Sequence, residues 1–270
     1  MVRLPRWLTW TLRLVVVGYL FFLVAWPVAL VAKHTFADGF DAMRTALSDP
    51  TVTHALRLTA EVAVFAVLIN LIFGVGVSLL LVRYEFPGKR LFSALLDLPL
   101  SVSPVVVGLA LLLVYNGVDG WFGKPLSHAG ITIIFSTPGM VMATVFVALP
   151  LVIREVVPIL EEIGDDQEQA ARSLGAGAWA TFRRVTLPSI KWAVAYGVVL
   201  SLARSLGEFG AVKIVSGNVV GSTQTATLVV EQKYQDFEQS TAYAAAFLLA
   251  FAAVLCIVVV TVIRPKEEQK

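Results

Sequence analysis

Long uninterrupted stretches of apolar residues dominate the hydrophobic pattern of the chain. About 20 apolar residues in a helix cross the hydrocarbon core of a bilayer, and six stretches reach that length. They are Leu14–Ala32, Leu58–Val82, Leu91–Tyr115, Thr132–Val157, Ile190–Phe209 and Ala242–Ile263. The stretches are too long and too continuous for the alternating strands of a membrane barrel. The pattern therefore predicts an all-α, polytopic membrane protein with about six transmembrane helices.

The composition agrees with this class. Of 270 residues, 57% are hydrophobic and 15% charged, whereas soluble domains carry about 25% charged residues. The single cysteine, Cys256, cannot form a disulfide or a cysteine-based metal site within one chain. A net charge of +2 without a basic block gives no indication of nucleic-acid binding.

Basic residues predict the orientation in the membrane. If both termini lie on one side, that side carries 14 of the 21 Lys and Arg residues and the other carries 6, with Arg204 inside a stretch. Because Lys and Arg in short loops stay in the cytoplasm, we expect cytoplasmic termini in a plasma (inner) membrane. The first stretch follows Arg3, Arg6 and Arg13 like a secretory signal, but its length and the Trp26-Pro27 pair favour an uncleaved anchor.

The connection between the fourth and fifth stretches is long and patterned as two short helices. Asp165 and Glu168 resemble a capping box at the start of the first helix, and Gly175 marks its end. The second helix carries Trp179, Phe182 and Val185 at a spacing of three. Pro188 is expected to end that second helix. The apolar face requires a covering surface, which is either the membrane and the underside of the bundle or a cytoplasmic partner.

A polar stripe lies on the fifth stretch. Ser201, Arg204, Ser205 and Glu208 fall at i, i+3, i+4 and i+7, so they share one helix face. Such residues face a bundle interior or a water-filled cavity, because charge in lipid is costly. Two interpretations remain open: Arg204 and Glu208 neutralise each other and hold helices together, or they attract and release a dianion along a pathway.

Two prolines interrupt the third stretch. Pro99 and Pro104 follow Asp97 and remove backbone hydrogen bonds. A broken helix beside a cavity is one way in which transporters expose backbone amides to an anion.

Residues for catalysis and for nucleotide binding are missing from the sequence pattern. The fragment Gly88-Lys89-Arg90 has Arg83 where a phosphate-binding loop requires its first glycine, and Leu91 where it requires Ser or Thr. The histidines, at positions 34, 54 and 128, are not spaced as metal ligands. We therefore expect no enzyme activity and no cofactor or metal in this chain, and any energy source must be a partner.

The connection around Gly175 resembles the coupling loop of binding-protein-dependent ABC importer permeases. The family pattern is Glu-Ala-Ala, three residues, Gly, then Leu-Pro. The matching residues are Gln169-Ala170-Ala171, Gly175 and Leu187-Pro188. The family glutamate is replaced by Gln169, with Glu168 adjacent, which puts in question any ion pair formed by that carboxylate in relatives.

Three further segments look like the sulfate, thiosulfate and molybdate branch of this family. They are Asp97–Val106, Phe135–Val141 and Ala203–Ala211. The similarity extends over residues 57–263. Within the branch, Val215–Gly217 and Thr227–Tyr234 are most similar to the W-type permeases of sulfate/thiosulfate importers.

The resemblance implies a type I ABC importer permease fold and a set of partners. These are a paralogous T-type permease, a dimer of ATP-binding subunits that hold ATP and Mg²⁺, and an extracytoplasmic sulfate-binding protein. It implies an N-terminal helix and loop at 1–56, a permease core at 57–263 with its coupling loop at 158–190, and a cytoplasmic tail at 264–270. The residues implied in coupling to the ATPase are Glu168, Gln169, Ala170, Ala171, Gly175, Trp179, Leu187 and Pro188. Alternatives are a molybdate or tungstate importer and, in another class, a stand-alone secondary anion transporter.

Overall fold

A computed structural model describes residues 5–37 and 39–263, so Arg3 and the predicted tail at 264–270 lie outside the described residues. The described part of the chain folds into helices, two of them short π-helical segments labelled η. In chain order they are α1 (Arg6–Leu20), η1 (Phe21–Ala25), α2 (Trp26–Thr35), α3 (Asp41–Ser48), α4 (Pro50–Arg83), α5 (Lys89–Ser101), α6 (Pro104–Tyr115), α7 (Gly123–His128), α8 (Thr137–Ile163), α9 (Asp166–Ser173), α10 (Ala178–Thr181), η2 (Phe182–Thr186), α11 (Leu187–Leu206), α12 (Gly210–Ser216), α13 (Ala226–Gln235) and α14 (Gln239–Ile263).

Five helical segments within residues 5–37 and 39–263 are long and apolar enough to cross a membrane. They are Trp7–Thr35, Pro50–Arg83, Thr137–Ile163, Ala178–Leu206 and Gln239–Val262. A sixth is formed if α5 and α6 together count as one broken span. The predicted class, all-α with about six spans, is confirmed.

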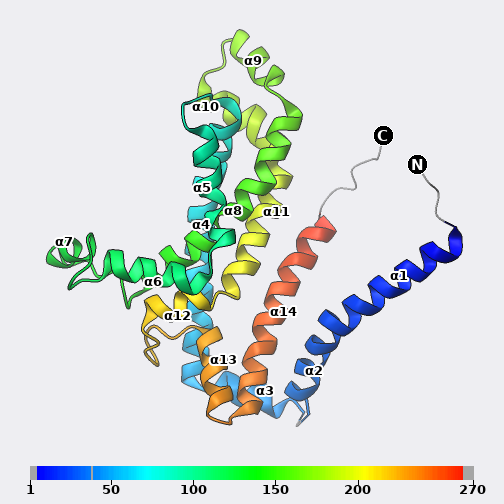
Figure 1. Cartoon of the computed structure of the whole chain (residues 1–270), viewed down its shortest axis with the longest axis vertical. Helices are drawn as coiled ribbons and strands as arrows, with labels where there is room; N and C mark the ends of the chain where they lie inside the picture. The colour runs from blue at the N-terminus through cyan, green and yellow to red at the C-terminus, as the bar shows by residue number, and fades with distance from the viewer. Residues whose placement is uncertain (1–4, 38, 264–270) are drawn as a thin grey trace.

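The third predicted span is broken rather than straight. Helices α5 and α6 meet at an angle of 112°, and α6 turns away from the bundle toward α7 (Figure 1). Pro104 begins α6, where its missing N–H costs no helical hydrogen bond. The predicted interruption is confirmed at Pro104, whereas Pro99, which was also expected to break the stretch, lies inside α5.

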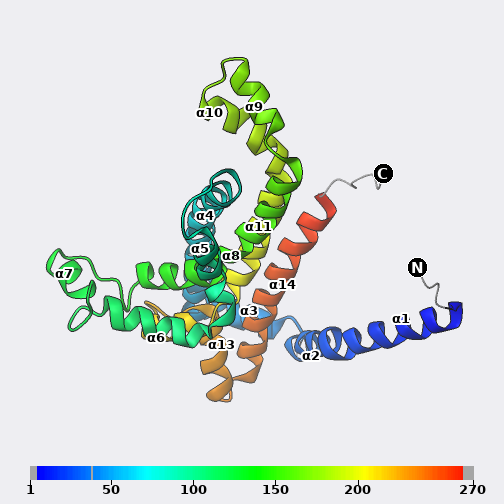
Figure 2. The same ribbon diagram turned by 45° about the horizontal axis from the view of Figure 1, so that its top comes forward.

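Helices α4, α8 and α11 form the tightly packed centre of the bundle, and they lie side by side in both views (Figures 1 and 2). Val152 of α8 is completely buried between glycines of the other two helices. A Cβ on Gly74 would lie 2.7 Å from Val152 Cγ1, and a Cβ on Gly197 would lie 3.0 Å from Val152 Cα. Small residues at these positions let the three backbones approach closely, which is how membrane helices gain packing energy.

The N-terminal helices stand apart from this centre. The most apolar 18-residue window within Trp7–Thr35 has none of its residues buried within the chain, and α1 extends away from the bundle (Figure 2). The last turn of α2 is anchored to α14. The Thr35 hydroxyl donates to the Tyr243 carbonyl at 3.0 Å, and the His34 and Tyr243 rings stack at 5.2 Å. The side chains of α1 are thus free to contact lipid or another subunit.

The two ends of the bundle are called here the α9 end and the α13 end. At the α13 end, the Lys233 ammonium lies 3.3 Å from Asp49 and 2.7 Å from Glu238. The hydrogen bond to Glu238 raises the pKa of Lys233 above its ordinary value, against the effect of burial, and Asp49 adds to the rise. Burial alone would raise the pKa of Asp49, but the Thr51 backbone N–H and Lys233 lower it. This cluster ties the start of α4 to the turn between α13 and α14.

Candidate functional site

The connection between α8 and α11 forms the α9 end of the molecule (Figure 1). Helix α8 continues to Ile163 and α11 begins at Leu187, so the connecting segment is shorter than the predicted 158–190. Gly175 follows α9 with φ +86°, a backbone conformation that side chains other than glycine's disfavour. The predicted helix stop at this glycine is confirmed.

The predicted capping box at the start of α9 is not formed. Asp165 is the N-cap residue, but its side chain makes no capping hydrogen bond. Glu168 instead turns into the protein and is 7% exposed. A carboxylate at this position gains more here than from one backbone N–H, because the Arg83 guanidinium donates to both of its oxygens and Thr186 adds a third donor.

Glu168 joins four helical segments through a buried hydrogen-bond network. Arg83, at the end of α4, donates to both carboxylate oxygens at 3.2 and 3.3 Å. Thr186, in η2, donates to Oε1 at 2.9 Å. Arg83 also donates to the carbonyls of Leu160 and Gly164, at 3.1 and 2.7 Å. The network therefore fastens α9 to α4, to the end of α8 and to η2.

The sequence did not point to Arg83 or Thr186 as partners of Glu168. Arg83 was named from the sequence only as a residue that departs from a phosphate-binding loop, and it lies 85 positions away from Glu168 along the chain. A contact over that distance has no local pattern. The ion pair does indicate that Glu168, beside the substituted Gln169, carries the structural carboxylate of this segment.

The second predicted helix does not end at Pro188. Four residues of α10 run into the π-helical η2, and the helix continues as α11 with Pro188 in its first turn. Thus Ala178–Leu206 forms one long helical segment. Pro188 lacks the N–H that an unbroken α-helix would use at this position, and the π-helical turn of η2 directly before it replaces the α-helical hydrogen-bond pattern there.

The outer surface of the α9 end is apolar and uncovered. Leu174 is 89% exposed and Trp179 is 71% exposed, with the Trp179 ring 5.7 Å from that of Phe182. Gln169 and Ala170 are also exposed. We call Gln169, Ala170, Leu174 and Trp179 the exposed ridge. Of the remaining predicted coupling residues, Ala171 and Leu187 are half-buried and Pro188 is exposed.

The polar stripe on α11 points mostly into the bundle. Ser201 is completely buried and Ser205 is 4% exposed. The Asn70 side-chain amide on α4 donates to the Ser201 hydroxyl at 3.3 Å, and Ser205 donates back to the Ser201 carbonyl at 2.7 Å. In the described part of the chain, Asn70 Oδ1 has no hydrogen-bond donor. Asn70 was not anticipated, since a single asparagine in an apolar run gives no periodic signal.

Arg204 and Glu208 form the predicted pair. Arg204 Nη1 lies 2.7 Å from Glu208 Oε2, and the two side chains are 37% and 2% exposed. The contact is an ion pair without hydrogen-bond geometry, because Oε2 has no hydrogen-bond partner among the residues described. The other oxygen, Oε1, accepts the Ala211 N–H at 3.0 Å. The contact between Arg204 and Glu208 supports the interpretation that the two charges neutralise each other, while a role in a pathway stays a prediction.

Titratable residues do not gather elsewhere as a metal site. Within residues 5–37 and 39–263, no three His, Cys, Asp or Glu side chains lie close enough to hold an ion. The chemistry that the chain offers is therefore mechanical and electrostatic: a docking ridge, a buried joint and charged pairs inside spans.

Comparisons with known proteins agree with this arrangement. The family described as "Binding-protein-dependent transport system inner membrane component" matches residues 70–266. The "Sulfate transport system permease protein CysW" of Synechococcus elongatus is 47% identical over 240 residues, covering 89% of this chain and 84% of that protein. The "Sulfate transport system permease protein CysT" of Escherichia coli K12 is 37% identical, covering 77% and 75%.

A solved structure shares the fold. A chain from the "bacterial alginate ABC transporter in complex with alginate pentasaccharide-bound periplasmic protein" superposes with a TM-score of 0.78 at 16% identity, covering 94% of this chain and 92% of that chain. The type I ABC importer permease fold is thereby confirmed, in a multi-pass membrane protein. The chain belongs to the family of binding-protein-dependent transport system inner membrane components.

Proposed function

We propose that this chain is the membrane-spanning permease subunit of an ATP-driven sulfate and thiosulfate importer. It forms the translocation pathway with a paralogous T-type permease, and a dimer of ATP-binding subunits docks on its α9 end. Those partner subunits bind ATP and Mg²⁺ and hydrolyse ATP. An extracytoplasmic sulfate-binding protein delivers the anion. The names of the Synechococcus and Escherichia relatives support the anion and the existence of a paralogous permease.

One observation carries the proposal: the exposed ridge is anchored to the transmembrane helices by a buried ion pair. Leu174 and Trp179 are solvent-exposed at the tip of the molecule, where large apolar side chains indicate a protein contact. Beneath them, Glu168 and Arg83 connect the segment to α4 and α8. A push on the ridge would therefore move α4 and α8 directly, since close-packed elements transmit displacement.

The α9 end lies in the cytoplasm in this proposal, together with both termini. The distribution of Lys and Arg supports this orientation, and Arg183 and Arg184 of η2 add exposed positive charge at that end. Ser201, Arg204, Ser205 and Glu208 then lie toward the other half of the α11 span and line or support the pathway. This placement agrees with the proposed domain bounds, in which the coupling segment lies inside the permease core at 57–263.

The docking test uses Gly175 and the ridge. Gly175→Trp places a bulky side chain beside the docking surface, where a Cβ meets nothing within 4 Å in the free chain. We expect this variant and Leu174→Asp to lose co-purification of the ATP-binding subunits and to lose uptake. Gly175→Ala controls for backbone strain at positive φ, and Trp121→Ala controls for loss of an exposed tryptophan elsewhere, since Trp121 is 84% exposed.

Full retention of the ATP-binding subunits and of uptake by Gly175→Trp and Leu174→Asp would contradict the docking role. The anion is tested separately by uptake of labelled sulfate into vesicles that hold the complete complex. Sulfate uptake that thiosulfate inhibits is expected. No sulfate uptake, together with molybdate uptake at low concentration, would replace sulfate by molybdate. Gradient-driven flux through the isolated chain would instead favour a stand-alone transporter.

A further inference from the structure

Helices α5 and α8 carry opposite charges at matching positions. Both α5 and the end of α8 lie at the α9 end, but α5 starts there and α8 stops there, so the two helices run antiparallel. Arg90 and Asp97 lie seven residues apart on α5, and Arg154 and Glu161 lie seven apart on α8. Seven residues rise about 10.5 Å along a helix. Asp97 therefore faces Arg154, and Arg90 faces Glu161, as two charge rungs between the helices.

The inner rung is closed. Arg154 Nη2 and Nε donate to Asp97 Oδ1 at 2.9 and 3.1 Å. Arg154 belongs to the candidate span Thr137–Ile163, nine residues before the end of α8, which is about 14 Å along the helix. The two side chains are nevertheless 59% and 52% exposed in this chain. Charged side chains on a membrane-spanning helix face water or protein rather than lipid, so this face of α5 and α8 belongs to an aqueous passage or an interface.

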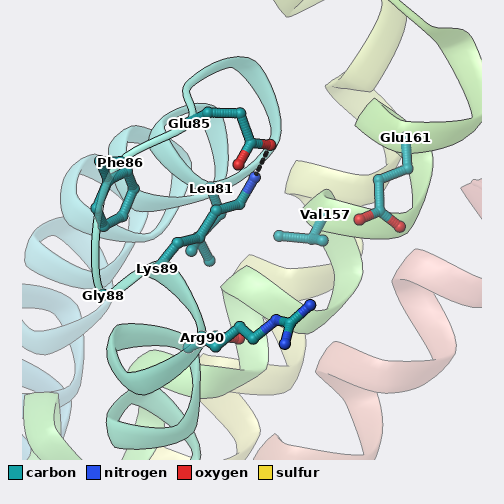
Figure 3. Close-up of a pocket in the computed structure, with 9 residues that line it drawn as sticks. Leu81, Glu85, Phe86, Gly88, Lys89, Arg90, Val157 and Glu161 are labelled. Atoms are coloured by element: carbon teal, nitrogen blue, oxygen red, sulfur yellow. Dashed lines mark hydrogen bonds and ion pairs between the residues drawn. The ribbon is translucent and has the colours of Figure 1, made fainter.

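The outer rung is open. Arg90 and Glu161 line a groove of about 580 Å³ between α5 and α8, together with Ser93 and Val157. Both charged side chains extend into the groove from opposite helices, with Val157 between them (Figure 3). Within the described residues, neither the Arg90 side chain nor the Glu161 side chain forms an ion pair or a hydrogen bond. By contrast, Lys89 at the same mouth is paired with Glu85 at 2.7 Å.

The groove is directly connected to the joint under the exposed ridge. Arg83 donates to the carbonyl of Leu160, the residue before Glu161, and holds Glu168 of α9 at the same time. A displacement of α9 therefore moves the α8 turn that carries Glu161. The outer rung lies where motion of the docking segment reaches the transmembrane helices.

We propose that the two rungs form a charge gate at the α9-side exit of the anion pathway. This inference rests on the proposed import function. When α5 and α8 close at their ends, Arg90 pairs with Glu161 and the groove shuts. When the helices separate, Arg154 leaves Asp97 and presents its guanidinium to the departing anion.

The chemistry of the rungs fits a tetrahedral oxyanion. A guanidinium offers parallel N–H donors that match two oxygens of such an anion. Conduction also requires release, so the contacts along a path must stay weak. A carboxylate opposite each arginine supplies this property, because it competes with the anion for the same donors. Asp97 and Glu161 thus limit how long a dianion remains bound at Arg154 and Arg90.

Cross-linking across the outer rung tests the gate. R90C/E161C is made in a Cys256→Ser background, and the complete complex is treated with a short thiol cross-linker without nucleotide and with ATP trapped by vanadate. We expect a clear shift in cross-link yield between the two states and a loss of uptake once the bridge forms. E85C/K89C is the matched control, because both positions belong to one turn and their separation does not depend on α8. A yield for R90C/E161C that is the same in both states, as for the control, would overturn the gate.

Charge reversal tests the inner rung. Asp97→Arg should reduce uptake by about tenfold or more, because two like charges then face each other. The double variant D97R/R154D should restore uptake, while co-purification of the ATP-binding subunits stays unchanged throughout. A double variant that assembles but remains inactive would overturn the pairing.

The cross-link readout does not require a known anion. A wild-type complex that fails to take up sulfate therefore refutes the proposed function, and the gate is then judged by cross-linking alone.

Discussion

Two buried glutamates, one at each end of the α11 region, have very different surroundings. Glu168 accepts hydrogen bonds from Arg83 and Thr186, which come from two other helical segments. Glu208, which follows α11, has one backbone donor and an ion pair with Arg204, four residues earlier in the last turn of α11. The first carboxylate joins helices that are far apart in sequence, whereas the second is held locally. Although the two carboxylates are similarly buried, their partners differ. Glu168 therefore acts as a fixed joint between helices, and Glu208 is a locally held charge that can change partners.

The strongest expected effect is at Glu168. Replacement by alanine leaves Arg83, 13% exposed, without its counter-ion, and breaking a buried pair costs about 3–5 kcal/mol. Thermal unfolding of the detergent-solubilised chain, followed by circular dichroism, should show this loss. Glu162→Ala is the matched control, since Glu162 is an exposed acid on α8. An equal unfolding temperature for the two variants would contradict the role of Glu168 as a joint.

Glu208 is expected to matter less for folding than for transport. Glu208→Gln keeps an oxygen acceptor for the Ala211 N–H and loses only the charge that faces Arg204, so the cost in unfolding free energy should be about 1 kcal/mol. We expect the complex to assemble and anion uptake to fall. Uptake at the wild-type level, or destabilisation as large as that of Glu168→Ala, would remove the distinction between the two glutamates.

A neutral contact on the polar stripe, between Asn70 and Ser201, sets the scale for hydrogen bonds in this bundle. The interaction between Asn70 and Ser201 should amount to about 0.6 kcal/mol, the average for such pairs between membrane helices. A double-mutant cycle with Asn70→Leu and Ser201→Ala measures it. A coupling free energy above about 2 kcal/mol would mean that the polar stripe on α11 contributes more to helix packing than such pairs do on average, and it would weaken the contrast with the joint at Glu168.

The smallest effect is expected at the α13 end. Lys233→Met should cost a few tenths of a kcal/mol, because partly exposed ion pairs contribute about 0.2–1 kcal/mol. The pKa of Lys233 is raised above 10.5 in the folded chain, so its contribution is present at neutral pH and is lost as the pH rises through the raised pKa. The difference in unfolding temperature between wild type and Lys233→Met should therefore shrink in strongly alkaline buffer. A difference that grows with pH would contradict the assigned ion pairs.

The sequence predicted features that depend on local pattern. Apolar length indicated the spans, Pro104 indicated the break between α5 and α6, and Gly175 indicated the end of α9. Each of these follows from residues within one segment. The spacing of four between Arg204 and Glu208 likewise predicted their contact.

Features that depend on tertiary contacts were missed or misread. Arg154 falls within the predicted stretch Thr132–Val157, but no local pattern indicated that it pairs with Asp97 on another helix. Glu168 was expected to cap α9, but Arg83 from the end of α4 competes for it more strongly. Pro188 was expected to stop a helix that the wider turn of η2 allows to continue. For Arg154 and Glu168 the deciding partner comes from another helix, and for Pro188 the deciding feature is the π-helical turn directly before it.

The central claim is that the exposed ridge of the α9 end holds the ATP-hydrolysing partner. It is tested most directly by placing a photo-activated cross-linking side chain at Trp179 in the complete complex and, as a control, at Trp121, which is also highly exposed. The account predicts that the side chain at Trp179 captures the ATP-binding subunit and that the one at Trp121 does not. Capture of that subunit at Trp121 and not at Trp179 would contradict it.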